Sequence, residues 1–157
     1  MYHTNGFSTL QTMLGGDRLI LLEKFDAALV VDLIERHRIT TVMVVPSMLY
    51  ALLDHPRFGD TDLSSLQTIF YGASPMSPTR LQQAIRSLGP IFFQFYGQTE
   101  SPQSVCVLRK EEHDPARPHL FGSCGRALQG VTVALLDDED NEVPTGDVGE
   151  ICVRGKI

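Results

Sequence analysis

Two short segments of this chain place residues with chemical potential directly after predicted strands. Residues 72–77 (Gly-Ala-Ser-Pro-Met-Ser) follow an apolar strand expected at 68–71, and residues 96–100 (Tyr-Gly-Gln-Thr-Glu) follow another expected at 91–95. Ligands of parallel sheets bind just beyond the carboxyl ends of the strands. If both strands belong to one parallel sheet, the two segments lie together at a binding edge.

The residue types in these segments suit a nucleotide. A turn of small residues around Gly72 lets a planar ring lie against the backbone, and Tyr96 offers an aromatic face for the same ring. Thr99 offers a hydroxyl for a phosphate, and Glu100 offers hard oxygen atoms for Mg²⁺. Together these side chains predict a nucleotide site.

Each residue taken alone also has a purely structural interpretation. Gly72 and Gly97 can be turn glycines, Tyr96 can be a core residue, and Glu100 can be a solvated acid before a helix that begins at Ser101. Short motifs often match by chance, so the weight rests on the combination.

Alternating elements are expected to position the site. Short apolar, β-branched runs alternate with helical segments, a pattern typical of βα units, so the fold class is α/β with a largely parallel sheet and flanking helices. Strands are expected at 19–22, 41–45, 68–71 and 91–95.

Two helices have well-marked ends. One is expected from an N-cap at Asp26 to His37, where basic residues meet the negative end of the helix dipole. The other is expected to begin at Ser77, an N-cap followed by proline, and to stop at Gly89 and Pro90.

The sequence after about residue 113 has a different texture. Acidic, proline and glycine turns separate apolar runs at 131–136 and 151–153, with a hairpin-like loop at 137–141 and no helix expected. The predicted division is an α/β subdomain at 1–112 and an incomplete β subdomain, part of a small sheet or barrel, at 113–157. Its uncovered strand edges favour self-association.

Bulk composition excludes several classes of partner. The net charge of −6 repels phosphate backbones, so nucleic acid is not expected, and no apolar run approaches the roughly 18 residues of a membrane span. The three cysteines form no CxxC pair and are expected to be small buried hydrophobes in a reducing, cytoplasmic setting. No chemistry is assigned to four histidines, expected to be solvated or capping residues: His37, His55, His113 and His119.

Four stretches, in order along the chain, resemble motifs of the adenylate-forming (AMP-binding) superfamily. Residues 96–100 resemble its Y-G-x-T-E motif, and residues 71–77 resemble its adenine-packing G-G-A-P-M-S segment. Residues 3–7 (His-Thr-Asn-Gly-Phe) resemble the H-x-x-G-F segment of the acyl-CoA synthetase branch, and residues 146–155 resemble the G-E-x-G-E-I-x-V-R-G strand.

The resemblance implies roles for individual residues. Tyr96 stacks on adenine, Gln94 lies near the adenine amino group, Thr99 touches the phosphate and Glu100 binds Mg²⁺. The remaining adenine or AMP contacts are Gly72, Ala73, Ser74, Pro75 and Gly97. His3, Phe7 and Phe95 line the acyl pocket, with Ser47 and Tyr71 as further candidates for its wall.

By the same resemblance, the chain is an internal fragment of a fatty-acid–CoA ligase. Such an enzyme activates a carboxylic acid with ATP and Mg²⁺ to an acyl-adenylate, then transfers the acyl group to CoA. The alternatives are an amino-acid-activating adenylation domain, which the segment at 3–7 disfavours, and a non-catalytic α/β binding module.

Several parts of the family's machinery have no match here. These are the phosphate loop, the ribose-binding aspartate and the lysine of the C-terminal domain; Asp147 is expected to be a surface turn residue, and Lys156 is not the family's lysine. The 157-residue piece alone is therefore expected to be inactive.

Overall fold

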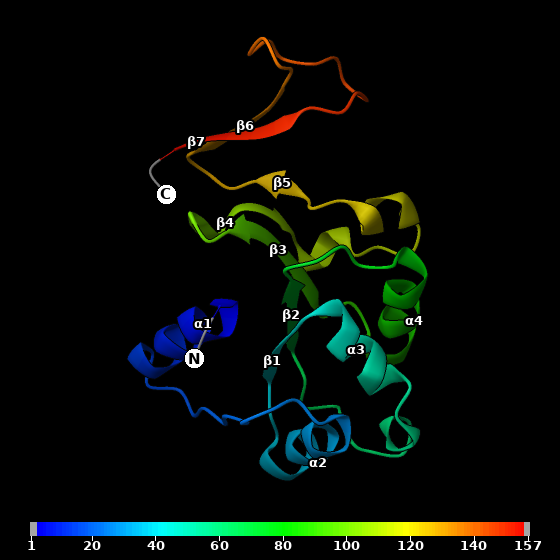
Figure 1. Cartoon of the computed structure of the whole chain (residues 1–157). Coiled ribbons are helices and arrows are strands. Elements are labelled where there is room, and N and C mark those ends of the chain that lie inside the picture. Colours follow the sequence, from blue (N-terminus) through cyan, green and yellow to red (C-terminus); the bar gives the residue numbers. More distant parts are fainter. Residues whose placement is uncertain (1–2, 156–157) are drawn as a thin grey trace.

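A computed structural model describes residues 3–155 of the chain, with side chains described at 9–101 and 105–155. One five-stranded sheet, in the order β1-β2-β3-β4-β5, forms the centre of the molecule, and a two-stranded sheet of β6 and β7 lies beyond it (Figure 1). The α/β fold class, with a largely parallel sheet and flanking helices, is confirmed.

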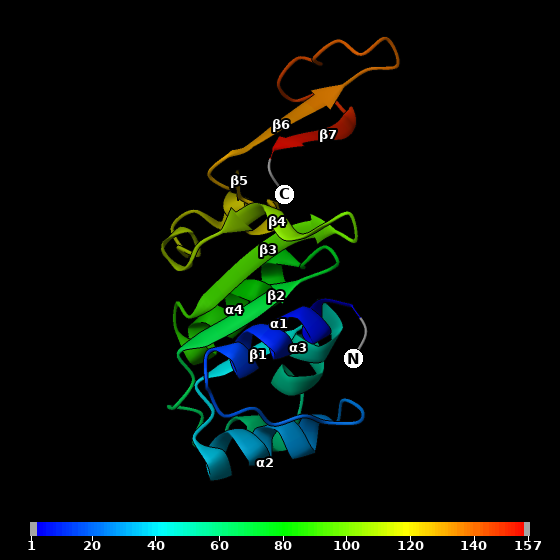
Figure 2. The ribbon, with the colours of Figure 1, turned by 90° about the vertical axis from the view of Figure 1, so that its left-hand side faces the viewer.

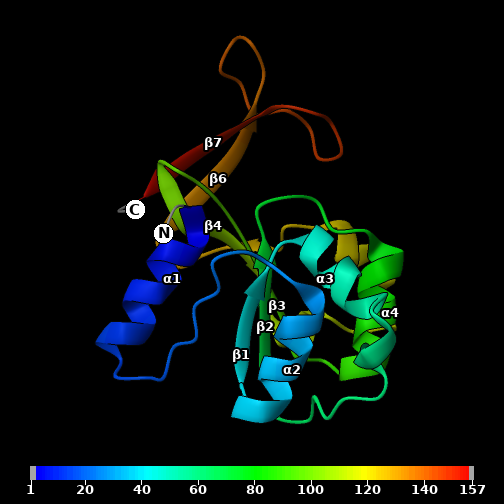
Figure 3. The same ribbon diagram turned by 60° about the horizontal axis from the view of Figure 1, so that its bottom comes forward.

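The parallel half of the sheet consists of β1 (Thr41–Val44), β2 (Thr68–Gly72) and β3 (Phe92–Gln98). The connections between these strands contain α3 (Pro46–Leu53) and α4 (Pro78–Leu88), as parallel strands require crossover segments. Figures 1 and 3 show both helices on one side of the sheet and α1 (His3–Leu14) on the other.

Both predicted helix starts are confirmed at the level of individual hydrogen bonds. α2 (Ala27–His37) is capped by Asp26, whose Oδ1 accepts from the Leu29 N–H over 2.9 Å. Ser77 caps α4, and the helix ends at Gly89 with a φ of 81°, a backbone conformation that favours glycine.

The strand expected at 19–22 is wrong. Residues 17–22 have no regular secondary structure and form the connection between α1 and α2, with Leu21 60% exposed. A strand requires a neighbour to pair with, and β1 at this edge pairs with β2 alone among the described residues. The local apolar pattern carries no information about that missing partner.

The rest of the five-stranded sheet is antiparallel. β3 turns back into β4 (Ser101–Leu108), so the alternative of a helix from Ser101 is wrong, and β5 (Arg126–Ala127) pairs with β4. Between β4 and β5 lie two short 3-10 helices, η2 (Lys110–Glu112) and η3 (Pro118–Gly122).

The expectation of no helix after residue 113 is wrong at η3. Pro118 stands at its first helical position, where a missing N–H costs nothing, and the Phe121 side chain is only 1% exposed. Burial of this ring accounts for the short helix. The five-stranded sheet ends with β5 at Ala127, and the strands after it belong to the second sheet. The subdomain division expected at 112/113 stays a prediction.

β6 (Val131–Leu136) and β7 (Glu150–Gly155) form the separate antiparallel hairpin at the top of Figure 2. The predicted loop at 137–141 is confirmed: Asp137 Oδ1 accepts from the Glu139 and Asn141 N–H groups at 3.0 and 2.8 Å. Leu135 and Ile151 remain 39% and 44% exposed, so this hairpin carries apolar side chains on its surface.

The hydrophobic core lies between the sheet and its helices. Its most deeply buried members come from α2, α3, α4, β2, β3 and η3: Val31, Ile34, Leu49, Ile69, Tyr71, Leu81, Ala84, Phe92 and Phe121. Across the described part of the chain, no helix combines the length and apolar character needed to cross a bilayer.

Candidate functional site

The two segments singled out in the sequence lie side by side in the structure. β2 and β3 are parallel neighbours, with Gly72 opposite Phe95 in the register. The chain leaves both strands at the same edge, so the β2–α4 loop, defined here as residues 72–77, lies beside Tyr96 and the turn that follows it. This is the edge at which parallel sheets bind ligands.

Gly72 is required by the close approach of the two strands. A Cβ atom at this position would lie 2.4 Å from the Phe95 carbonyl oxygen, nearer than side-chain atoms approach a backbone. The next residue, Ala73, has a φ of 67°, which is uncommon for a residue with a side chain. The loop therefore begins with an enforced sharp change of direction.

The β2–α4 loop combines an exposed centre with an anchored end. Ala73, Ser74 and Pro75 are exposed, whereas Met76 is 6% exposed. The Ser77 N–H donates to the Tyr50 hydroxyl over 2.8 Å. These three exposed residues were predicted from the sequence to contact adenine, as was the buried Gly72.

β3 carries two of the candidate nucleotide residues on one face. Side chains alternate along a strand, so Gln94 and Tyr96 point to the same side. The Gln94 Oε1 atom is buried and has no hydrogen-bond partner among the described residues. An unpaired buried acceptor costs about 1–3 kcal/mol, so this amide is suited to accepting a hydrogen bond from a ligand. Tyr96 is half-buried, and its hydroxyl accepts from Gln98 Nε2 over 3.2 Å.

Thr99 and Glu100 form the tip of the turn between β3 and β4. Gln98 is paired with Ser101, which leaves two residues to make the turn, and both are exposed. The register between β3 and β4 shifts between Tyr96 and Gln98, at Gly97. Among the described residues, the Glu100 carboxylate has no ion pair or hydrogen bond, so its oxygen atoms are available to a cation.

The opposite face of β3 borders a large hollow. Phe95 is 7% exposed there, and the neighbouring Phe70 and Phe93 rings are in edge contact, with centroids 5.4 Å apart. The hollow has a volume of about 1020 Å³ and lies between this face, α1 and the connection to α2. Adenine-site and acyl-pocket candidates therefore occupy opposite faces of one strand.

The remaining acyl-pocket candidates have different outcomes. His3 and Phe7 belong to α1, but their side chains lie outside the described residues. Tyr71 is wrong as a pocket-wall residue because its side chain is fully buried in the core on the helix-covered face. Ser47 is exposed at the start of α3 and does not line the hollow.

His113 is a residue that sequence reasoning missed. Of the two expected environments, the capping one is confirmed, because His113 is the C-cap residue of η2. The solvated one is wrong, because its side chain is fully buried and its Nε2 lies 2.9 Å from the Tyr71 hydroxyl. Its Nδ1 lies 2.7 Å from the Arg109 carbonyl oxygen. Burial is the main cause that lowers the pKa of His113 below 6.5 and raises that of Tyr71. Because Tyr71 directly precedes the β2–α4 loop, this buried hydrogen-bonded pair helps to fix the end of β2 from which the loop begins.

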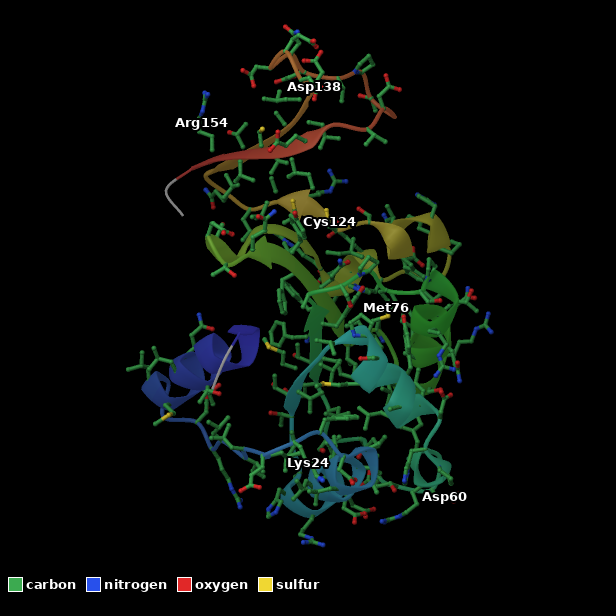
Figure 4. The ribbon with its side chains drawn as sticks, viewed as in Figure 1. Lys24, Asp60, Met76, Cys124, Asp138 and Arg154 are labelled. Carbon is green, nitrogen blue, oxygen red and sulfur yellow. The ribbon has the colours of Figure 1, made fainter. Side chains whose placement is uncertain are left out.

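The cysteines occupy three environments instead of the single buried one expected. Cys106 is buried opposite Tyr96, Cys124 is exposed and Cys152 is intermediate; all three are free thiols. Burial, with a smaller contribution from the neighbouring Cys124 thiol, raises the pKa of Cys106 to about 11. Cys124 is exposed because it precedes β5 at the edge of the sheet (Figure 4). Asp147 is an exposed turn residue, as expected, with its N–H donating to the Pro144 carbonyl over 3.0 Å.

Comparison with known proteins assigns this chain to a family. A family model described as AMP-binding enzyme matches residues 1–157. The chain is 52% identical over 146 residues to the medium/long-chain-fatty-acid–CoA ligase FadD8 of Mycobacterium tuberculosis, covering 93% of this chain and 25% of that protein. It is 34% identical over 153 residues to the fatty acid–[acyl-carrier-protein] ligase ScoC of Streptomyces coeruleorubidus, covering 97% of this chain and 29% of that protein.

A solved structure agrees with the sequence relatives. The amide bond synthetase McbA from Marinactinospora thermotolerans superposes with a TM-score of 0.80 at 37% identity, covering 88% of this chain and 28% of that one. The chain thus spans between a quarter and three tenths of the length of these relatives. The match of the family model over the whole chain shows that this chain belongs to the AMP-binding enzyme family.

Proposed function

We propose that the complete protein is an acid–thiol ligase that uses ATP to convert a carboxylic acid to its acyl-adenylate and then transfers the acyl group to CoA. The observation that carries this proposal is the two-sided end of β3. One face presents Gln94 and Tyr96, the other presents Phe95 to a large hollow whose wall on the sheet side is apolar, and Glu100 lies at the tip of the following turn. A reaction that joins an acid to a nucleotide needs both partners to meet at such a place.

The adenine ring is proposed to lie between Tyr96 and the β2–α4 loop. Tyr96 supplies an aromatic face, and the unpaired Gln94 Oε1 accepts from the adenine amino group. Gly72, Ala73, Ser74 and Pro75 form the opposite wall, where the absence of large side chains lets the ring approach the backbone. Gly97 lies where the register between β3 and β4 shifts, and its lack of a side chain leaves room beside Tyr96.

Thr99 and Glu100 are proposed to act on the phosphate end of the nucleotide. Both are exposed at the turn that follows β3, and the Thr99 hydroxyl can donate to a phosphate oxygen. Glu100 is the carboxylate that this chain is proposed to supply to the metal, and no group of three acidic, histidine or cysteine side chains converges within the described residues. That arrangement fits Mg²⁺, which commonly takes one or two carboxylates together with substrate phosphates. A bound Mg²⁺ would stabilise negative charge on the phosphates.

The proposed acid substrate is a medium- or long-chain fatty acid. The wall formed by Phe70, Phe93, Phe95 and Val107 is apolar, and a hollow of about 1020 Å³ has room for an alkyl chain. The relative at 52% identity is a medium/long-chain-fatty-acid–CoA ligase by its name. His3 and Phe7, on α1, are proposed to complete the pocket.

Three further properties belong to this proposal. The protein acts in the cytoplasm, and nucleic acid is not among its partners, in keeping with its net charge of −6.

Residues 1–112 form the subdomain that carries the adenine and acyl segments, and 113–157 form part of a β subdomain. The exposed Leu135 and Ile151 on the β6–β7 hairpin favour self-association of the isolated chain.

The proposal is tested with the complete protein, ATP, Mg²⁺, CoA and a panel of fatty, aromatic and amino acids. Pyrophosphate release and mass spectrometry of the acyl-CoA product should show the highest kcat/KM for fatty acids. Preference for an amino acid would favour the adenylation-domain alternative, and no pyrophosphate with any acid would contradict ligase function. The isolated 157-residue chain serves as a control that should give no product.

A further inference from the structure

Tyr50 connects α3 to the end of the β2–α4 loop. Its hydroxyl accepts a hydrogen bond from the Ser77 N–H over 2.8 Å and donates one to Met76 Sδ over 3.4 Å. Figure 4 shows Met76 near α3, at the level where the loop passes the helix. One hydroxyl group therefore bonds two consecutive residues at the point where the loop becomes α4.

The position of Tyr50 is itself fixed by Arg80. The Arg80 guanidinium lies over the Tyr50 ring, 5.2 Å from its centroid, and donates to the Tyr50 carbonyl oxygen over 3.1 Å. The same guanidinium forms a 2.7 Å ion pair with Asp54 at the end of α3. A cation held over an aromatic face and bonded on two sides restricts the rotamers of the tyrosine. Arg80 and Asp54 thereby orient the hydroxyl toward the loop.

The loop between these anchors has little other support. It is fixed at its start by the contact between Gly72 and the Phe95 backbone, and at its end by Met76 and Ser77. The three residues between are exposed. The location of these exposed residues relative to Tyr96 thus depends on the two ends of the loop. The Tyr50 hydroxyl acts on the second end, together with the Ser77 N-cap of α4 and the burial of Met76.

We propose that Tyr50 is a positioning residue for nucleotide recognition, which holds the β2–α4 loop at the spacing from Tyr96 that admits an adenine ring. The inference rests on the proposed function, because the loop and Tyr96 are taken as the two walls of the adenine site. Tyr50 touches no substrate in this account. It acts through the backbone of Ser77 and the side chain of Met76.

The test compares Tyr50→Phe with the unchanged complete protein. Phenylalanine keeps the ring beneath Arg80 and removes the hydroxyl alone. Loss of the two hydrogen bonds that the hydroxyl makes at the loop should raise the KM for ATP by roughly 3- to 10-fold while kcat changes less than about twofold. The ratio of kcat/KM for ATP over GTP should fall by a similar factor, since the spacing of the walls selects the base.

A matched control removes hydrogen bonds at the start of β2, the strand whose other end leads into the β2–α4 loop. Lys110 Nζ donates to the Gln67 carbonyl oxygen and to Thr68 Oγ1 at 2.8 and 2.7 Å, at the start of β2. Lys110→Met should lower the thermal unfolding temperature without changing the KM for ATP or the base preference. A general loss of stability is thereby separated from a displaced loop.

Hydrogen exchange without nucleotide provides a readout that does not depend on catalysis. Tyr50→Phe should accelerate amide exchange in peptides covering 72–77, and Lys110→Met should not. Unchanged exchange, or faster exchange with unchanged ATP KM and base preference, would overturn the proposed role. If the unchanged complete protein neither binds ATP nor forms an acyl-adenylate, the proposed function fails first, and this inference fails with it.

Discussion

The Tyr71 hydroxyl and the His113 Nε2 atom are joined by a 2.9 Å hydrogen bond between two fully buried side chains. The geometry also defines the tautomer. His113 Nδ1 faces the Arg109 carbonyl oxygen at 2.7 Å, and a carbonyl can only accept, so Nδ1 carries the proton. Nε2 of the neutral ring then accepts from the Tyr71 hydroxyl. An imidazolium would instead donate from Nε2 to the Tyr71 oxygen, and the Tyr71 hydroxyl hydrogen would lose His113 as its acceptor.

This pair predicts a loss of stability in mild acid. Burial lowers the folded-state pKa of His113 below 6.5, outweighing the backbone carbonyl of Arg109 and the nearby Glu111 and Glu112, which raise it. Between the folded-state pKa and 6.5 the unfolded chain binds more protons, so the free energy of unfolding rises with pH. The contribution is fully present above pH 6.5 and is lost as the pH falls through the folded-state pKa.

Urea unfolding of the chain between pH 7.5 and 5 measures this dependence. The His113→Phe variant keeps a ring that can pack beside Phe92 and Phe121, whose centroids lie 6.3 and 6.4 Å from that of His113. It should be less stable at pH 7.5 and show a shallower dependence on pH, because the other histidines are unchanged. An identical pH dependence in the two proteins would contradict the assignment to His113.

Substitution of Gln94 should stabilise the nucleotide-free protein but weaken nucleotide binding. Gln94→Leu removes the unpaired buried Oε1, so the nucleotide-free protein should gain up to about 1 kcal/mol of unfolding free energy. The same change removes the proposed acceptor of the adenine amino group, and the KM for ATP should rise roughly 3- to 10-fold. Thermal unfolding and ATP titration measure the two effects. Gln129→Leu, at an exposed position, is the matched control and should change neither.

His3 should influence the choice of acid and leave the use of ATP unchanged. In the complete protein, His3→Ala should alter the ranking of fatty and aromatic acids by kcat/KM, since one lost pocket contact is worth about 1–3 kcal/mol. His119→Ala removes an exposed histidine outside the site and should leave the ranking intact. Equal losses for every acid would indicate a structural histidine.

Sequence reasoning succeeded where local chemistry decides the structure. Asp26, Ser77 and Gly89 mark helix ends through hydrogen bonds and backbone angles within a few residues, and all three were recognised. Parallel pairing of β2 with β3 followed from their short apolar pattern and the helical segment between them. The adjacency of the two candidate segments could therefore be anticipated without coordinates.

Long-range packing accounts for what was missed. The partner of His113 is 42 residues away at Tyr71, and that of Ser77 is 27 residues away at Tyr50; neither spacing has a local signature. The unpaired Oε1 of Gln94 likewise depends on neighbours from adjacent strands. The strand expected at 19–22 is the converse case, in which an apolar run found no partner to pair with.

The most direct test of the account concerns the carboxylate at the tip of the β3–β4 turn. ATP–pyrophosphate exchange with the preferred acid is measured for the complete protein and its Glu100→Gln variant, with Glu139→Gln, in the exposed β6–β7 loop, as a control. The account predicts a fall of roughly two to three powers of ten for Glu100→Gln, with a smaller change in ATP affinity, and no change for the control. An exchange rate for Glu100→Gln equal to that of the unchanged protein would contradict it.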